Sequence, residues 1–297
     1  MNPYVCYACP RNCGVLRSSQ SHGYCGMGEN PVIARAALHF DEEPVISGSN
    51  GSGAVFFSGC SLRCCFCQNY PISHDGFGQE VTPQRLRDIY FELIDQGAHN
   101  INLVNPTHFL EPILESLKGG LPVPVVWNSS GYERVESLRR LEGIVQVYLP
   151  DLKYAEEYSA RRYSSAPDYF QYASAAIKEM LRQTGPVEIN KDGIIQRGTI
   201  VRHLILPGRA DESIEILDWI ADNLPGAWIS LMAQYLPFGD VAGVDQLNRR
   251  LTQEEYDRVS DHLLELGLED GFIQELSSSD EKYIPHFDLT GVAPKIQ

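Results

Sequence analysis

The chain has 297 residues, 43% of them hydrophobic and 21% charged, which suffices for one large α/β domain of ordinary globular composition. Its formal net charge is −15 and it has no lysine- and arginine-rich run. Nucleic acid is therefore excluded as an expected partner, because phosphate binding requires clustered positive charge.

The apolar residues form no membrane-spanning run, since none approaches the roughly 18–20 residues that a helix needs to cross a bilayer. Residues 1–6 also lack the charged and apolar regions of a signal peptide. We therefore expect a cytoplasmic protein without a membrane partner. Disulfides are rare in that compartment, so the eight cysteines indicate metal binding or redox chemistry.

Residues 1–50 read as an irregular segment rich in cysteine, glycine and proline, and residues 48–53 have the composition of a linker. A repeating pattern of strands and helices begins after this linker. The sequence thus predicts two units, a cysteine-rich metal-binding N-terminal segment over 1–50 and a β/α domain with a C-terminal extension over 51–297.

The N-terminal segment carries four cysteines, Cys6, Cys9, Cys13 and Cys25. Four thiolates can saturate a zinc ion or a second iron–sulfur cluster, and the spacing does not choose between them. The first three resemble a cluster loop, whereas 24–26 (Tyr-Cys-Gly) resembles half of a zinc or rubredoxin-type knuckle. The alternative is four reduced thiols, but an arm with so few apolar residues requires a metal to stay ordered.

From residue 54 onward, short apolar runs alternate with amphipathic stretches. Strands are expected at residues 54–57, 101–104, 123–127, 144–149, 199–206, 228–233 and 271–275. Helices are expected at residues 82–96, 110–118, 132–141, 168–183, 211–223 and 252–266. This alternation predicts parallel β/α units. About six units are too few for a closed eightfold barrel, so we expect a partial, open TIM-like barrel, with a doubly wound sheet as the alternative.

A second cysteine cluster follows the strand at 54–57 directly, with Cys60, Cys64 and Cys67 in a C-x3-C-x2-C spacing. Three thiolates can hold three corners of a [4Fe-4S] cluster, which leaves the fourth iron without a protein ligand. Catalytic metal sites keep such an open position, whereas structural sites close it. The carboxyl ends of strands are also where β/α folds bind ligands.

Two alternatives to an iron–sulfur site remain at this loop. Buried thiols without metal are one, and a zinc site with Cys65 or His74 as its fourth ligand is the other. We expect Cys65 to be a bystander, because the side chains of adjacent cysteines leave the loop in different directions.

With Gly59 before it, Phe66 inside it and Asn69 after it, the triplet resembles the signature of the radical S-adenosylmethionine (SAM) superfamily. The resemblance extends over about residues 53–275, and within the superfamily it is strongest to proteins related to pyruvate formate-lyase activating enzyme. Further landmarks at predicted strand ends support it, namely residues 105–109, 127–132, 148–154, 202–208 and 234–237.

The resemblance implies a mechanism and a set of site residues. SAM would chelate the open iron, and the reduced cluster would cleave it to methionine and a 5′-deoxyadenosyl radical that abstracts a hydrogen atom. The residues implied in SAM binding are Phe66, near the adenine, and Asn69, Thr107, His108, Asn128, Ser129, Arg202 and Gln234. The residues implied in catalysis are Asp151 and Lys153, which match an Asp-x-Lys element.

The chain departs from the family pattern in two places. Residues 105–108 stand where relatives carry a Gly-Gly-Glu element for the methionyl amine, so Thr107 or a backbone carbonyl would have to replace it. Gln234 stands where activating enzymes tend to carry a histidine.

Structural roles compete with the functional ones at several positions. Asp151 and Lys153 would form a surface ion pair, Arg202 a buried salt bridge, and His108 a helix start bonded to backbone. His203 alternates to the opposite strand face from Arg202 and is expected to be structural.

These observations favour a radical SAM enzyme that acts on a glycine of a partner enzyme, as a glycyl-radical activase does. A low-potential donor such as flavodoxin or ferredoxin would reduce its cluster. Radical modification of a small molecule or peptide is the second hypothesis. A hypothesis of another class is a non-catalytic iron–sulfur electron carrier or metal-stabilised binding module.

Overall fold

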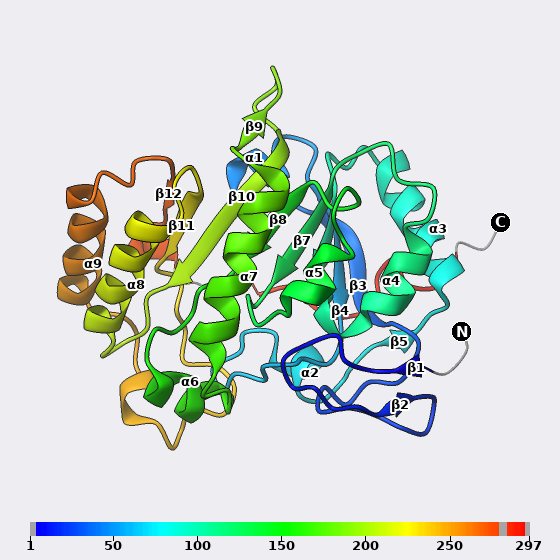
Figure 1. Cartoon of the computed structure of the whole chain (residues 1–297), viewed down its shortest axis with the longest axis horizontal. Coiled ribbons are helices and arrows are strands. Elements are labelled where there is room, and N and C mark those ends of the chain that lie inside the picture. Colours follow the sequence, from blue (N-terminus) through cyan, green and yellow to red (C-terminus); the bar gives the residue numbers. More distant parts are fainter. Residues whose placement is uncertain (1–3, 279–283, 295–297) are drawn as a thin grey trace.

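The computed structural model describes residues 4–278 and 284–294 of the chain. Within these residues, ten strands form one sheet in the order β12-β11-β10-β8-β7-β6-β4-β3-β5, with β9 paired to β10 (Figure 1). The strands are β3 (Val32–His39), β4 (Ser52–Phe57), β5 (Gln79–Glu80), β6 (Ile101–Val104), β7 (Val125–Ser129), β8 (Val147–Pro150), β9 (Glu188–Ile189), β10 (Ile195–Leu204), β11 (Trp228–Met232) and β12 (Gly271–Ile273).

From β4 to β12 the neighbouring strands of this order are parallel, whereas β3 pairs antiparallel with both β4 and β5. The sheet is open, with β12 and β5 at its two edges. Parallel strands connected through helices agree with the predicted β/α units. An open sheet is consistent with the expected partial barrel.

Helices follow the parallel strands, and Figure 1 shows α3, α4, α5, α7 and α8 in front of the sheet. The helices are α1 (Pro44–Ser47), α2 (Tyr70–Ser73), α3 (Pro83–Asp95), α4 (Leu110–Ser116), α5 (Val135–Arg139), α6 (Glu157–Ser164), α7 (Tyr169–Thr184), α8 (Ala210–Asn223) and α9 (Gln253–Glu265). Thr82 caps the start of α3, because Arg85 N–H donates to Thr82 Oγ1 (3.1 Å). No helix in the described part of the chain is long and apolar enough to cross a membrane.

Alternation along the strands separates the core from the polar face of the sheet. Ile101 and Leu103 of β6 belong to the same buried apolar cluster as Leu86 and Tyr90 of α3. Asn102, between them, points to the opposite face, because successive strand side chains alternate. That opposite face also carries Asn128 and Arg202, whose side chains line the cavity described below.

The expectation that residues 1–50 are irregular is wrong for 32–39, which form β3 in the main sheet. This strand contains three alanines and an arginine, which are not typical strand formers, so its apolar pattern is weak. Its pairing with β4, rather than its composition, makes it a strand. The helix α6 was also not predicted, because its sequence is mostly polar.

Residues 284–294 run along β3 and cover part of its outer edge. Ala36 N–H donates to Thr290 O (2.8 Å), and Leu289 N–H donates to Ala34 O (3.0 Å). The ring of Phe287 packs edge-on against Phe56, with centroids 5.6 Å apart. These bonds satisfy backbone groups of β3 that would otherwise form an open sheet edge.

Gly291→Ala should detach this C-terminal segment from β3. Gly291 has φ +72°, and an added Cβ would lie 2.0 Å from Ala36 O, which the backbone cannot accommodate. Hydrogen exchange of the Ala36 amide should accelerate at least about tenfold, since that bond would open locally. The control is Gly97→Ala, which also has a positive φ (+95°) but open space around it. Equal exchange in both variants would contradict this packing.

Candidate active site

A cavity of about 240 Å³ lies at the carboxyl ends of the parallel strands. Its walls come from the ends of β4, β6, β7, β10 and β11, from the segment after β8, from the cysteine loop, and from residues 39–42. Of the predicted site residues, Cys60, Cys64, Phe66, Cys67, Asn69, Asn128, Ser129, Asp151, Lys153, Arg202 and Gln234 line it. The topology thus gathers side chains from distant segments at one sheet end, as expected for a β/α fold.

The three cysteines of the predicted triplet all face this cavity. Cys60 Sγ accepts hydrogen bonds from the N–H groups of Leu62 (3.3 Å) and Arg63 (3.4 Å). Burial raises the pKa of the Cys60 thiol, and it raises that of Cys67 to about 12, with the nearby Cys64 adding to both. Without a bound cation the Cys60 and Cys67 thiols therefore stay protonated at neutral pH.

Neither candidate for a fourth protein ligand lines the cavity. The Cys65 backbone is held elsewhere, because its N–H donates to Tyr163 O and its carbonyl accepts from Asp240 N–H (both 2.8 Å). The His74 ring stacks on Tyr70 with centroids 4.0 Å apart. The chemistry of this donor set, three thiols around one cavity, fits a [4Fe-4S] cluster with one open iron.

No group of three or more His, Cys, Asp or Glu residues in the described ranges is arranged to hold a metal ion. A cubane cluster is larger than one ion, so its corner thiolates stand further apart than thiolates that share a single ion. The triplet is therefore not arranged around a single ion such as zinc.

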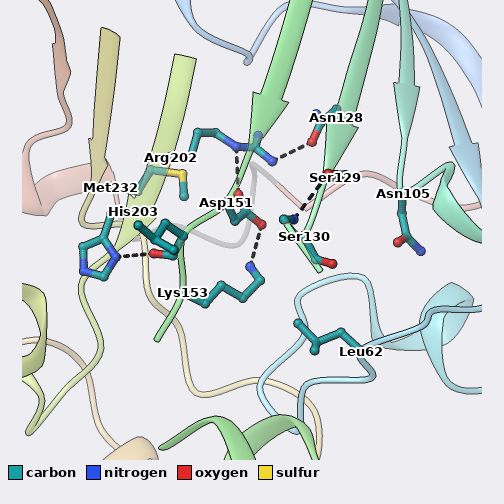
Figure 2. Close-up of polar contacts among 12 residues, drawn as sticks. Leu62, Asn105, Asn128, Ser129, Ser130, Asp151, Lys153, Arg202, His203 and Met232 are labelled. Carbon is teal, nitrogen blue, oxygen red and sulfur yellow. Dashed lines mark hydrogen bonds and ion pairs between the residues drawn. The ribbon is translucent and has the colours of Figure 1, made fainter. Parts of the chain in front are cut away.

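Asp151 is the centre of a buried polar network on the cavity wall (Figure 2). Lys153 Nζ donates to Asp151 Oδ2 (2.5 Å), and Arg202 Nε donates to Oδ1 (2.9 Å). Arg202 Nη2 also donates to Asn128 Oδ1 (2.6 Å). Burial alone would raise the pKa of Asp151, but Arg202 and Lys153 hold it below its usual value. The pair is not a surface ion pair, because both side chains are largely buried.

Glu42 joins this network from the N-terminal segment and was not predicted. Its Oε1 accepts from Asn128 Nδ2 (3.1 Å) and Asn102 Nδ2 (3.0 Å), and its Oε2 lies 3.4 Å from Arg202 Nη1. Arg202 thus has a carboxylate on each side, which compensates its buried charge. The structural salt bridge expected as an alternative for Arg202 is present, and it lies in the cavity wall.

Thr107 and His108 do not line the cavity. Thr107 Oγ1 donates to the buried Glu133 Oε1 (2.7 Å), and His108 Nε2 lies 2.7 Å from Ser58 O. Burial lowers the pKa of His108 to about 3, so the ring is neutral and Nε2 donates to that carbonyl. His203 is likewise buried, with bonds to Leu152 O (2.7 Å) and Ser213 Oγ (2.9 Å), as its strand face predicted.

Asn105 takes the place beside the cysteine loop that was expected for Thr107. It has a left-handed backbone (φ +59°), which asparagine tolerates better than most residues. Its Nδ2 donates to Gly59 O (2.6 Å), and its Oδ1 lies 3.7 Å from Cys60 Sγ. The Asn-Pro pair directly after the strand at 101–104 was the signal in the sequence that marked this turn.

The N-terminal cysteines gather in the segment that carries the small antiparallel pair β1 (Tyr4–Val5) and β2 (Leu16–Arg17). Cys6, Cys9 and Cys25 are buried, and Cys13 is partly buried. Burial, with smaller contributions from the other three thiols, raises the pKa of the Cys9 thiol to about 12. The four side chains therefore lie near enough to act on one another electrostatically.

Comparison with known proteins gives a relative in sequence and a shared fold. No family model matches the chain. The uncharacterized protein MJ0674 of Methanocaldococcus jannaschii is 32% identical over 264 residues, which cover 85% of this chain and 72% of that protein. Two crystal structures of Streptococcus suis SuiB, bound to the precursor peptide SuiA or to S-adenosylmethionine, superpose with TM-scores of 0.51 at 10% and 12% identity. They match 73% of this chain but only 46% and 48% of SuiB. This likeness concerns the fold.

Asp151→Asn should destabilise the protein by about 3–5 kcal/mol at pH 7, because it leaves Lys153 and part of Arg202 buried without their carboxylate. The pKa of Asp151 is lowered on folding, so its contribution is fully present above its unfolded pKa of about 3.9 and is lost as the pH falls through the folded value. Urea unfolding should show that the difference in free energy of unfolding between the wild type and Asp151→Asn narrows below about pH 4. Asp261→Asn, at an exposed position, is the control. A difference that does not change with pH would contradict the lowered pKa of Asp151.

Proposed function

Since the chain belongs to the same family as MJ0674 and has the fold of the radical SAM superfamily, we propose that it is a radical SAM enzyme. The observation that carries the proposal is the meeting, in one cavity, of three cysteines and the Asp151–Arg202–Lys153 network. A cavity with metal-binding thiols and convergent charges at the carboxyl ends of parallel strands is where catalysis is expected.

Cys60, Cys64 and Cys67 would hold a [4Fe-4S] cluster with one open iron. When bound and reduced, the cluster supplies the electron that cleaves SAM to methionine and a 5′-deoxyadenosyl radical, which then removes a hydrogen atom from the substrate. The chain itself orients the cofactor and excludes water. The N–H groups of Leu62 and Arg63, which already point to Cys60 Sγ, would stabilise the thiolate form of that ligand.

Asn105 would bind the methionyl amine of SAM in place of the missing Gly-Gly-Glu element. Its Oδ1 faces Cys60 Sγ, and once that sulfur is a metal-bound thiolate it has no proton to donate. The amide oxygen is then free to accept a hydrogen bond from an ammonium group beside the cluster. Thr107 is less suited to this role, because its hydroxyl already donates to Glu133.

Lys153 is the cation best placed for a carboxylate in this cavity. The ammonium group has three N–H donors, and one is directed to Asp151. Arg202 has fewer donors to offer, because Asp151, Asn128 and Glu42 occupy its guanidinium. Asp151 raises the pKa of the buried Lys153 against the effect of burial, so the pair stays ionised and acts by charge rather than by proton transfer.

Aromatic and polar side chains that line the cavity would hold the nucleoside. Phe66 is buried against Tyr163 and Tyr235, which fixes its ring at the cavity. Ser129 and Asn128 line the cavity at the end of β7, where Asn128 is also bonded to Arg202. Asn69 and Gln234 complete the predicted set that lines the cavity.

For the substrate we propose a glycine of a partner enzyme, with reduction of the cluster by a flavodoxin or ferredoxin. The resemblance to activating enzymes supports this, and the SuiB structure with its precursor peptide supports a polypeptide substrate more generally. Modification of a peptide is the second candidate, because Gln234 replaces the histidine of activating enzymes. We also propose that the N-terminal cysteines hold a zinc ion or a second iron–sulfur cluster.

Anaerobically reconstituted protein given dithionite and SAM should release 5′-deoxyadenosine and methionine, measured by liquid chromatography. The variant with Cys60, Cys64 and Cys67 all changed to alanine should release neither, because the cluster loses its ligands. A wild-type protein that holds about four irons per chain but forms no 5′-deoxyadenosine would contradict the proposed reaction.

Asn105→Ala should weaken SAM binding about tenfold or more, since a hydrogen bond to a charged group is lost. Equilibrium dialysis with labelled SAM measures the effect directly. Asn223→Ala, a surface change on α8, is the matched control. An unchanged Kd for Asn105→Ala would show that another group binds the amine.

The glycyl-radical assignment has its own test. Incubation of the reduced enzyme and SAM with a purified glycyl-radical enzyme from the same organism should produce a carbon-centred radical in the electron paramagnetic resonance spectrum. Deuteration of the glycine α-carbon should then remove the hydrogen splitting of that signal. Product formation from SAM without any such radical would favour the peptide alternative.

A further inference from the structure

Arg11, which lies between Cys9 and Cys13, connects the N-terminal cysteine segment to the cysteine loop of the SAM site. Its Nε donates to Ser61 O (2.8 Å), inside the loop that carries Cys60. Its other nitrogens donate to Ser165 O (2.6 Å) and Ser164 O (2.9 Å) at the end of α6. One side chain therefore holds carbonyl groups of both the cysteine loop and the end of α6.

A second contact joins the same two segments at Gly59. This glycine has φ +78°, and a Cβ added to it would lie 2.7 Å from Cys25 O and 2.4 Å from Met27 Cγ. The backbone before Cys60 thus lies directly against the backbone that follows the last N-terminal cysteine. A shift of Cys25 would therefore displace the start of the cysteine loop that carries Cys60.

Arg17 is buried among the N-terminal cysteines, with 1% of its surface exposed. Its Nη1 donates to Met27 O and Gly28 O (both 3.0 Å), and its Nη2 donates to Cys25 Sγ (3.1 Å). Among the described residues the side-chain groups that act on Arg17 are Cys25, Cys6 and Tyr4, none of them a carboxylate, and its buried Nε has no hydrogen-bond partner. A buried guanidinium requires an anionic partner.

A four-thiolate metal centre would provide that partner. Each cysteine loses its proton when it binds the metal, and a tetrathiolate zinc site or iron–sulfur cluster carries net negative charge. The same segment leaves Val5, Tyr7 and Leu16 exposed, while Cys6, Cys25 and Met27 pack into an apolar cluster shared with the main sheet.

We infer that Cys6, Cys9, Cys13 and Cys25 hold a metal centre, charge-balanced by Arg17, which clamps the cysteine loop of the SAM site through Arg11 and Gly59. The effect of the clamp on SAM binding rests on the proposed function. The presence of the metal centre does not. Zinc and iron–sulfur versions share the same thiolate chemistry, but the four cysteines, like the other described residues, are not arranged around a single ion, which favours the cluster. Metal and sulfide analysis separates them.

The first test removes the SAM cluster and retains the N-terminal cysteines. The variant with Cys60, Cys64 and Cys67 changed to alanine is purified anaerobically as the full chain and analysed for zinc, iron and sulfide. We expect about one zinc, or about four irons with four sulfides, per chain. A variant that is folded by circular dichroism but holds neither would overturn the centre, whatever the wild type does with SAM.

The second test concerns Arg17. In the same triple-alanine background, Arg17→Met should raise the rate of metal loss to a chelator about tenfold or more, as loss of an outer-shell partner does. Arg17→Lys should restore part of the retention, because it keeps the charge. The exposed Arg161→Met is the control. Equal retention in all these proteins would overturn the role of Arg17.

The third test separates the clamp from the metal. In the otherwise wild-type chain, Arg11→Ala should leave the N-terminal metal in place and weaken SAM binding several-fold in equilibrium dialysis. Changing Cys6 and Cys9 to serine should remove the metal and weaken SAM binding at least as much. Normal SAM affinity in both variants would overturn the clamp. If the wild-type protein itself does not bind SAM, the proposed function is wrong and the metal centre is judged by the first test alone.

Discussion

The buried ion pair between Asp151 and Arg202 is the interaction on which the arrangement of the site depends. Charges within a sheet are tolerated only when they are paired and hydrogen-bonded. Here one carboxylate accepts from both Arg202 and Lys153, and a second carboxylate, Glu42, completes the surroundings of the guanidinium. The network joins strands that are distant in sequence and fixes the charged wall that faces the cysteine loop.

The cysteine loop is held by contacts on both of its sides. Asn105 bonds to Gly59 O within the cavity, whereas the N-terminal segment presses against Gly59 from outside and bonds to Ser61 through Arg11. Thiolates that must place one open iron accurately benefit from such support, because outer-shell groups orient the ligands. The proposed radical chemistry and the proposed N-terminal centre are therefore coupled through one short stretch of backbone.

Much of the fold follows from local patterns in the sequence, because buried parallel strands are short apolar runs and the helices between them carry caps such as Thr82. The spacing of Cys60, Cys64 and Cys67 predicted that they share one site, and the three side chains line one cavity. The strand β3 was not, since its alanines become a strand only by pairing with β4. Thr107 and His108 turned away from the cavity while Asn105 faced it, a difference set by backbone angles. Glu42 reaches Arg202 across 160 residues, which no local pattern reveals.

The central claim is that the cavity holds a cluster with an iron open to SAM. Electron paramagnetic resonance of the dithionite-reduced, anaerobically reconstituted protein tests it most directly. The account predicts that added SAM changes the g-values of the reduced [4Fe-4S] signal, and that SAM with a ¹⁵N-labelled amine adds a nitrogen coupling in double-resonance spectra. A reduced cluster whose spectrum is identical with and without saturating SAM would contradict the account.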